Sequence, residues 1–445
     1  MTSLVVFAAL LAAGASAQVD ATSPAPLSFQ IGGAEFTPGG FMDFTSVLRT
    51  TNVGSGIGTS FGSIPFSNTT AGHLSEERMS LQNSRLSLAI ASKRGDTDYT
   101  GYVEADFLGN AANSLVVSSN ANTLRMRLFW FDARHGKWEV LAGQSWSLLT
   151  PNRDGVGAMP SDIFYTQDMD TNYQAGLVWT RAPQLRLVYH ATPNLAWGMA
   201  VENPEQYVTS AVTFPAVDGA AYASQFDIGG SGSSTPNLRP LLIAKLAWDR
   251  PAPGHHLHLE IAGESNAVRV YSPVSGKTAT ANGAGVSLNG SAEIAPGVSL
   301  IATLFYSDGG GRLIQGLGPD AVIRPNGTPA LVRSDSSILG FEAKRGSNLL
   351  FGYYSLAYFG RAAYRDTNGS EEGFGFAGSS SSANRSIQEA TLGLTHTFWK
   401  DPHYGALELI SQYSYLLREP WSVNPDNPRN AKTNMMFLDL RYVLP

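Results

Sequence analysis

The chain has 445 residues, no cysteine, a formal charge of -6 and only 15% charged residues. The lack of cysteine excludes the small secreted folds that disulfides hold together, and the acidic balance excludes a broad nucleic-acid-binding surface. Glycine and aromatic residues are abundant, with 46 Gly, 17 Tyr, 21 Phe and 8 Trp. This composition is neither that of a helical membrane protein nor that of a disordered chain, and it favours an all-β fold.

The N-terminus carries the pattern of an export signal. An apolar run at 4–13 is followed by Ala15-Ser16-Ala17, so residues 1–17 are predicted to be a signal peptide. The run is shorter than the roughly 20 apolar residues that a membrane-spanning helix needs, and no later stretch approaches that length. Residues 18–40 are rich in Ser, Pro and Gly and are predicted to form an N-terminal tether.

From residue 41 onward, apolar and polar residues alternate with the period of two that is typical of β-strands. In the segment 123–133, Arg125 and Arg127 lie on one face, and the opposite, apolar face holds Leu124, Met126, Leu128 and Trp130. We expect that apolar face to contact lipid. The alternation predicts sixteen strands, at 41–49, 80–92, 98–108, 123–133, 137–147, 176–191, 195–202, 236–249, 255–264, 282–294, 298–307, 329–345, 348–359, 387–399, 405–418 and 433–444.

The connections between these strands alternate between short and long. Seven short breaks contain Gly, Pro, Asp or Asn, which favour turns. Eight long polar connections lie between them, at 50–79, 109–122, 148–175, 203–235, 265–281, 308–328, 360–386 and 419–432. Outer-membrane barrels have short periplasmic turns and long external loops. We therefore predict a transmembrane antiparallel β-barrel over residues 41–445. Splitting the strand 176–191 at Pro183 would give seventeen strands and break the alternation.

The faces of the predicted strands fit lipid outside and water inside. In the segment 241–249, Leu242, Leu246 and Trp248 share one face, whereas Lys245 and Asp249 share the other. Charges at inward positions would be costly in a packed core, but they cost little in a water-filled lumen. Aromatic residues near strand ends suit the girdles at the two membrane surfaces, and they include Trp138, Trp248, Trp399 and Tyr442.

The stretch 124–149, LRMRLFWFDARHGKWEVLAGQSWSLL, resembles the DcaP-like branch of Gram-negative outer-membrane porins, together with Asn83-Ser84-Arg85-Leu86 and Glu104-Ala105-Asp106-Phe107 before it. In that family an arginine-bearing strand leads through a short turn to a Gly-Gln-Thr/Ser-Trp-Ser segment at the start of the third loop. The segments RAPQLR at 181–186 and AVENP at 200–204 are similar to the family's next hairpin. The resemblance covers residues 80–204 and is architectural beyond them.

The resemblance implies a homotrimeric barrel in the cell outer membrane, in contact with its lipid. It also implies passive diffusion of small hydrophilic solutes, with some members favouring organic anions. The chain departs from the usual barrel ending, an aromatic residue, because it ends in Val443-Leu444-Pro445. Tyr442, with Leu438 and Leu440, still predicts an outward apolar row in the last strand.

The strongest candidate site consists of charged residues on the predicted lumen face of consecutive strands. In this site Arg85, Arg125 and Arg127 are expected to face Glu104 and Asp106, and Arg186 lies on a later strand. Guanidinium groups that face acids across a narrow pore produce a transverse field, and rings of charge set ion preference. The alternative is that these residues only pair with one another.

The loop 148–175 is expected to be the constriction loop, because the third loop of porins folds inward. It contributes Arg153 and Asp154 to the candidate site, and its acids are expected to face the arginines.

No metal, cofactor or catalytic centre is predicted. His256, His258 and Glu260 share a strand face, but the sequence indicates no further ligand beside them. Two other functions remain open at this point: an outer-membrane barrel enzyme and a soluble secreted β-rich carbohydrate-binding protein. The second leaves the alternation of long loops and short turns unexplained.

Overall fold

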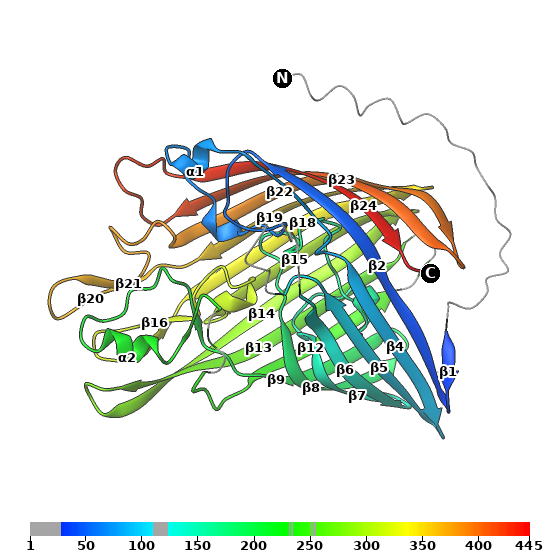
Figure 1. Cartoon of the computed structure of the whole chain (residues 1–445). Coiled ribbons are helices and arrows are strands. Elements are labelled where there is room, and N and C mark those ends of the chain that lie inside the picture. The colour runs from blue at the N-terminus through cyan, green and yellow to red at the C-terminus, as the bar shows by residue number, and fades with distance from the viewer. Residues whose placement is uncertain (1–27, 110–122, 231, 233–234, 251, 253–254) are drawn as a thin grey trace, which may run out of the picture.

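In the computed structural model, sixteen strands close into an antiparallel barrel (Figure 1). The structure describes residues 28–109, 123–230, 232, 235–250, 252 and 255–445, so the predicted signal peptide 1–17 and residues 18–27 of the tether lie outside the described part. The predicted fold class is confirmed. The barrel strands are β2 (Ala34–Arg49), β4 (Arg85–Arg94), β5 (Thr97–Asp106), β6 (Arg125–His135), β7 (Trp138–Trp146), β8 (Arg181–Thr192), β9 (Leu195–Glu202), β12 (Leu241–Arg250), β13 (Leu257–Ser272), β14 (Lys277–Ala295), β15 (Val298–Asp308), β18 (Arg333–Arg345), β19 (Asn348–Phe359), β22 (Asn384–Asp401), β23 (Gly405–Pro420) and β24 (Ala431–Val443).

Strand β2 closes the barrel. It pairs with the last strand, β24, from Phe41 to Arg49, and with β4 from Ala34 to Phe41. Two short strands, β1 (Phe29–Ile31) and β3 (Glu76–Ser80), pair only with β2 among the described residues. Residues 34–40, which we predicted as part of the tether, are therefore strand, because their pairing with β4 satisfies the backbone despite the Pro-Gly-Gly composition.

The long connections gather at the end of the barrel opposite the C-terminus, and the short turns lie at the C-terminal end (Figure 1). The connection predicted at 265–281 is not a loop. Strands β13 and β14 continue through it as a paired hairpin, in which Ser272 faces Lys277. Polar residues hid this extension, because a strand that projects beyond the membrane needs no apolar face.

The long connections carry short elements, and no helix in the described ranges is long and apolar enough to cross a membrane. These elements are η1 (Phe61–Ser63), α1 (Thr70–His73), η2 (Pro160–Asp162), β10 (Tyr207–Val208), α2 (Gly219–Ala223), β11 (Asp227–Ile228), η3 (Gly311–Leu313), β16 (Ala321–Ile323), β17 (Pro329–Leu331), β20 (Ala362–Arg365) and β21 (Glu371–Phe374).

The barrel is apolar outside and polar inside. Leu242, Leu246 and Trp248 are exposed on its outer surface, whereas Lys245 and Asp249 on the same strand are buried inside. The predicted faces of this strand are therefore confirmed. The predicted girdle residues Trp138, Trp248 and Trp399 are also exposed, and each lies near the short-turn end of its strand.

Strand β6 contains a β-bulge. Its pairing with β5 joins Glu104 to Leu128 but Ala105 to Met126, so Arg127 is an extra residue without a partner in the register. A bulge of this kind inserts one residue and shifts the alternation of all following side chains.

The bulge reverses the predicted faces of the second half of β6. Leu128 and Trp130, which we expected to contact lipid, are only 0% and 5% exposed and point inward. Phe129 and Phe131 are 58% and 60% exposed and form the outer face instead. The prediction was wrong here because a strict period of two cannot show an inserted residue.

Candidate functional site

The loop between β7 and β8, residues 147–180, lies inside the barrel. Its backbone N–H groups donate hydrogen bonds to carboxylates of four different wall strands. These bonds join Leu148 N to Glu202 Oε1 (2.8 Å), Asn152 N to Glu260 Oε1 (3.3 Å), Gly155 N to Asp249 Oδ2 (3.1 Å) and Ala175 N to Glu389 Oε2 (2.8 Å). Because the acceptors lie on β9, β13, β12 and β22, the loop crosses the lumen.

Two of the predicted site residues hold this loop in place. Arg186 is fully buried and donates to the carbonyl oxygens of Trp146 (2.6 Å) and Gly157 (3.3 Å). Arg153 binds both carboxylate oxygens of Glu342, at 3.0 and 2.8 Å. Burial opposes the charge of Arg153, but Glu342 outweighs it, so the pKa of Arg153 is raised above its ordinary value.

The other arginines and acids of the predicted site do come together on the wall. Arg127 lies between Glu104 and Asp106, with 2.8 Å from its Nη1 to Asp106 Oδ2. Arg125 binds Asp106 through two hydrogen bonds of 3.0 and 2.6 Å, and Arg85 Nη1 is 4.0 Å from Glu104 Oε1. The side chain of Arg127 is 3% exposed, whereas that of Arg125 is 38% exposed. The cluster therefore has one more positive than negative charge, and Arg125 is its most exposed cation.

Tyr173 covers this cluster from the loop. Its hydroxyl accepts hydrogen bonds from Arg85 Nη2 (3.3 Å) and Arg127 Nη2 (3.2 Å). Burial would raise the pKa of Tyr173, but the neighbouring arginine charges outweigh it, so this pKa lies below its ordinary value. The expectation that the acids of the loop face the arginines is wrong for Asp170, whose carboxylate accepts the backbone N–H of Thr59 at 3.1 Å instead.

The Gly-Gln pair at 143–144 fits the bulge of β6. Gly143 has φ +133°, and a Cβ there would lie 2.4 Å from the carbonyl oxygen of Phe129. Only glycine allows this close approach. Gln144 Nε2 then donates to the carbonyl oxygen of the bulged Arg127 at 2.9 Å. This local geometry leads the chain from β7 into the crossing loop.

Sequence reasoning missed Arg181, the first residue of β8. Its guanidinium carbon lies 5.4 Å from the ring centroid of Trp146 and 5.8 Å from that of Trp179. Within the described ranges its side chain has no ion pair and no hydrogen bond, so the two indole rings are its main partners. The available signal was its place in the RAPQLR segment, directly after the long loop.

The loop separates two cavities of opposite charge. The outer cavity, about 630 Å³, is lined by residues of the long connections, and its charged lining in the described part of the chain consists of Arg181 and Arg312. The inner cavity, about 480 Å³, lies toward the short turns. Its acidic lining residues outnumber the basic ones, Arg134 and His190, and comprise Asp98, Asp132, Glu139, Asp154 and Asp162.

Known structures share this fold. The outer membrane channel DcaP of Acinetobacter baumannii superimposes with a TM-score of 0.65 at 16% sequence identity, over 92% of this chain and 97% of that chain. The anion-selective porin from Comamonas acidovorans gives a TM-score of 0.51 at 13% identity, over 92% and 99% of the two chains. No protein-family model matches the sequence, and no curated protein matches it. The predicted resemblance to DcaP-like porins is confirmed at the level of the fold, which is that of outer-membrane porins.

Proposed function

We propose that the chain is an outer-membrane porin, not an enzyme, through which small hydrophilic solutes diffuse passively with a preference for anions. The outer cavity carries this proposal, because Arg181 and Arg312 are its charged lining residues and no carboxylate lines it among the described residues. A solute that enters from the long-loop side therefore meets positive charge first. Such a field concentrates anions at the entrance and repels cations.

Arg181 is the residue to which we assign the anion preference. Its guanidinium has no carboxylate partner in the described ranges, and a free guanidinium offers a forked donor to a carboxylate or phosphate. The rings of Trp146 and Trp179 keep the group in place without neutralising it. Arg312 contributes less, because its Nε lies 3.7 Å from the carboxylate of Asp320.

The predicted site residues have different roles in this proposal. Arg125, and to a smaller extent Arg85, present positive charge to the passing solute, while Arg127, Glu104 and Asp106 form the rigid wall behind them. The loop contacts of Arg153 and Arg186 fix the constriction, and Asp154 faces the inner cavity.

Planar-bilayer recording tests both parts of the proposal. The purified protein is expected to give stepwise openings, with a reversal potential that indicates anion preference in a KCl gradient near 0.1 M, where the Debye length is about 10 Å. The Arg181→Gln variant should lower the anion-to-cation permeability ratio. The matched control is Arg333→Gln, because Arg333 is exposed and already paired with Asp335. A protein without channel openings overturns the porin, and an unchanged reversal potential in Arg181→Gln overturns the role of Arg181.

We also propose a homotrimer in outer-membrane lipid. This part is supported by the resemblance of residues 80–204 and by the shared fold. The mass of the purified protein in detergent, measured by light scattering with the detergent subtracted, should equal three mature chains, each 47.5 kDa less the predicted signal peptide of residues 1–17. A mass of one chain would contradict the trimer.

A further inference from the structure

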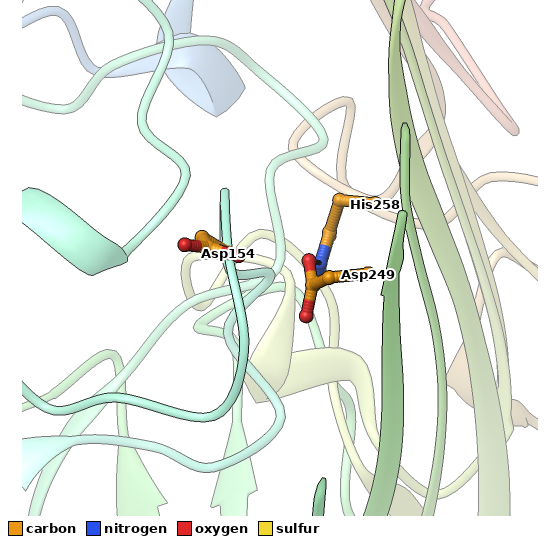
Figure 2. Close-up of side chains that lie close together, drawn as sticks. All are labelled: Asp154, Asp249 and His258. Carbon is orange, nitrogen blue, oxygen red and sulfur yellow. Dashed lines mark hydrogen bonds and ion pairs between the residues drawn. The ribbon is translucent and has the colours of Figure 1, made fainter. Parts of the chain in front are cut away.

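Four side chains with metal-binding atoms meet at the edge of the inner cavity. Asp154 comes from the crossing loop and Asp249 from β12; His258 lies in β13, and His256 directly precedes that strand. Figure 2 shows Asp249 and His258 side by side at the wall, with Asp154 on the loop opposite them. The ligand atoms of Asp154, Asp249 and His258 all lie within 4.8 Å of one another. His256 Nε2 is 3.8 Å from Asp154 Oδ1 and 3.9 Å from Asp249 Oδ1.

The two carboxylates of this group lack a lysine or arginine partner in the described part of the chain. Asp249 accepts hydrogen bonds from His258 Nδ1 (2.7 Å) and from Gly155 N (3.1 Å). Among the described residues, Asp154 has one group within ion-pair distance, the Nε2 of His256. Carboxylate oxygens of Asp154 and Asp249 lie within 4.8 Å of each other, so their negative charges repel. A cation placed between them would remove this repulsion.

We propose that Asp154, Asp249 and His256 bind a divalent transition-metal ion of the zinc type. Zinc accepts carboxylate oxygen and imidazole nitrogen at about 2.0–2.2 Å, which puts neighbouring ligand atoms of a tetrahedral site about 3.4 Å apart. The His256 separations of 3.8 and 3.9 Å exceed this value by a few tenths of an ångström, and the ligand atoms of Asp154 and Asp249 lie within 4.8 Å of each other. Movement of the exposed Asp154 side chain toward Asp249 and His256 would complete the site. Water supplies the remaining position. Magnesium and calcium are disfavoured because they prefer oxygen ligands alone.

His258 acts as a positioning residue rather than a ligand. Its Nδ1 faces Asp249 and its Nε2 lies 3.3 Å from Glu260 Oε2, so both ring nitrogens are engaged. A hydrogen bond from His258 to Asp249 fixes the orientation of a ligating carboxylate, as outer partners do in other metal sites. Glu260 forms an ion pair with Lys245, with 3.0 Å between Glu260 Oε1 and Lys245 Nζ. The set His256, His258 and Glu260 seen in the sequence was therefore not the site, and Asp154 and Asp249 are the ligands that it lacked.

A metal ion here would connect the crossing loop to the barrel wall. Asp154 belongs to the loop, Asp249 to β12 and His256 to the connection just before β13, so the ion would fasten the loop at the inner cavity. It would also add positive charge to a cavity that is lined mainly by acids. Under the proposed porin function, zinc should therefore raise the anion-to-cation permeability ratio, because it offsets the acids that repel anions.

Calorimetric titration of the intact barrel tests the site without any need for channel activity. Protein purified without a histidine tag and freed of metal with a chelator is expected to bind one Zn²⁺ per chain. Asp154→Asn and His256→Asn should each weaken zinc binding by at least about tenfold, the lower range for changes even of outer partners. The matched control is His255→Asn, because His255 is exposed and adjacent but outside the group. Retained heat-dependent mobility on gels shows that each variant is folded.

The outcomes test the metal-site proposal and the porin proposal independently. Absence of zinc binding, or wild-type affinity in both variants, overturns the site, and equal affinity for Mg²⁺ overturns the role of the imidazole. The reversal potential is measured separately: zinc should raise the anion-to-cation permeability ratio of the wild type and leave that of Asp154→Asn unchanged. If calorimetry shows the site but the protein forms no channels, the porin proposal fails and the metal site stands.

Discussion

Replacing Arg127 with Met is expected to destabilise the barrel by about 3 kcal/mol. Arg127 is 3% exposed and holds Glu104 and Asp106, both of which are buried. Removing one partner of a buried ion pair costs about 3–5 kcal/mol because the other charge is left uncompensated. Here Asp106 keeps its two hydrogen bonds from Arg125, and Glu104 keeps Arg85 at 4.0 Å and the Tyr102 hydroxyl at 3.2 Å, so the cost lies at the lower end of that range. Methionine retains most of the side-chain volume, so the loss of packing is small.

The free energy of unfolding is measured by urea titration of the protein folded in phospholipid vesicles. Arg125→Met is the matched control. Its side chain is 38% exposed and Arg127 still neutralises Asp106, so the expected cost is below about 1 kcal/mol. In the double variant Glu104→Gln/Arg127→Met, the weakly compensated charge of Glu104 is absent and part of the stability should return. The reasoning is refuted if Arg127→Met is as stable as Arg125→Met, or if the double variant recovers nothing.

Four further outcomes are expected. In this cysteine-free chain, Phe129→Cys should react with lipid-soluble probes and Leu128→Cys should not; the reverse result would contradict the bulge. Glu342→Gln removes the partner of a loop arginine, so single-channel recordings should show a noisier open state, whereas an unchanged trace would mean that this ion pair is not needed to hold the loop. The opposite charges of the two cavities should make the current–voltage curve asymmetric, and Arg181→Gln should reduce the asymmetry; a linear wild-type curve would refute this. The pKa of Asp154 is raised, so as pH falls from about 8 to 4 this residue should lose its negative charge at a higher pH than an ordinary aspartate. Reversal potentials of the wild type and Asp154→Asn, compared across this range, check this loss of charge.

Most of the barrel could be predicted from the sequence, because its strands obey a simple rule. In a strand with lipid on one side and polar atoms on the other, apolar and polar residues alternate. In β12, for example, Leu242 faces outward and Lys245 faces inward. The rule failed where the backbone leaves the regular pattern. The extra residue at Arg127 shifts the phase, and the projecting β13–β14 hairpin has no lipid face to reveal it.

The candidate site was only partly predictable. Arg125 and Asp106 lie on the same face of neighbouring strands, so their meeting follows from strand order and register. Which of the cluster residues the loop then covers depends on contacts between distant segments, such as that of Tyr173 with Arg127. Arg181 was missed because Pro183 interrupts the alternation of side chains beside it. In addition, nothing in the local sequence shows that its guanidinium has no carboxylate as an ion-pair partner among the described residues.

Carboxylates of the barrel wall hold the crossing loop through its backbone N–H groups, so the path of the loop depends little on its side chains. Contacts such as those of Glu202 and Glu389 do not depend on which side chain the loop residue carries, because every residue except proline has the same N–H group. Side chains that the loop presents to the cavities can therefore be exchanged while its path is kept. For pore engineering, a substitution at Asp154, which lines the inner cavity, should change the solute preference while the loop keeps its path, whereas a change at Glu389 should displace the loop.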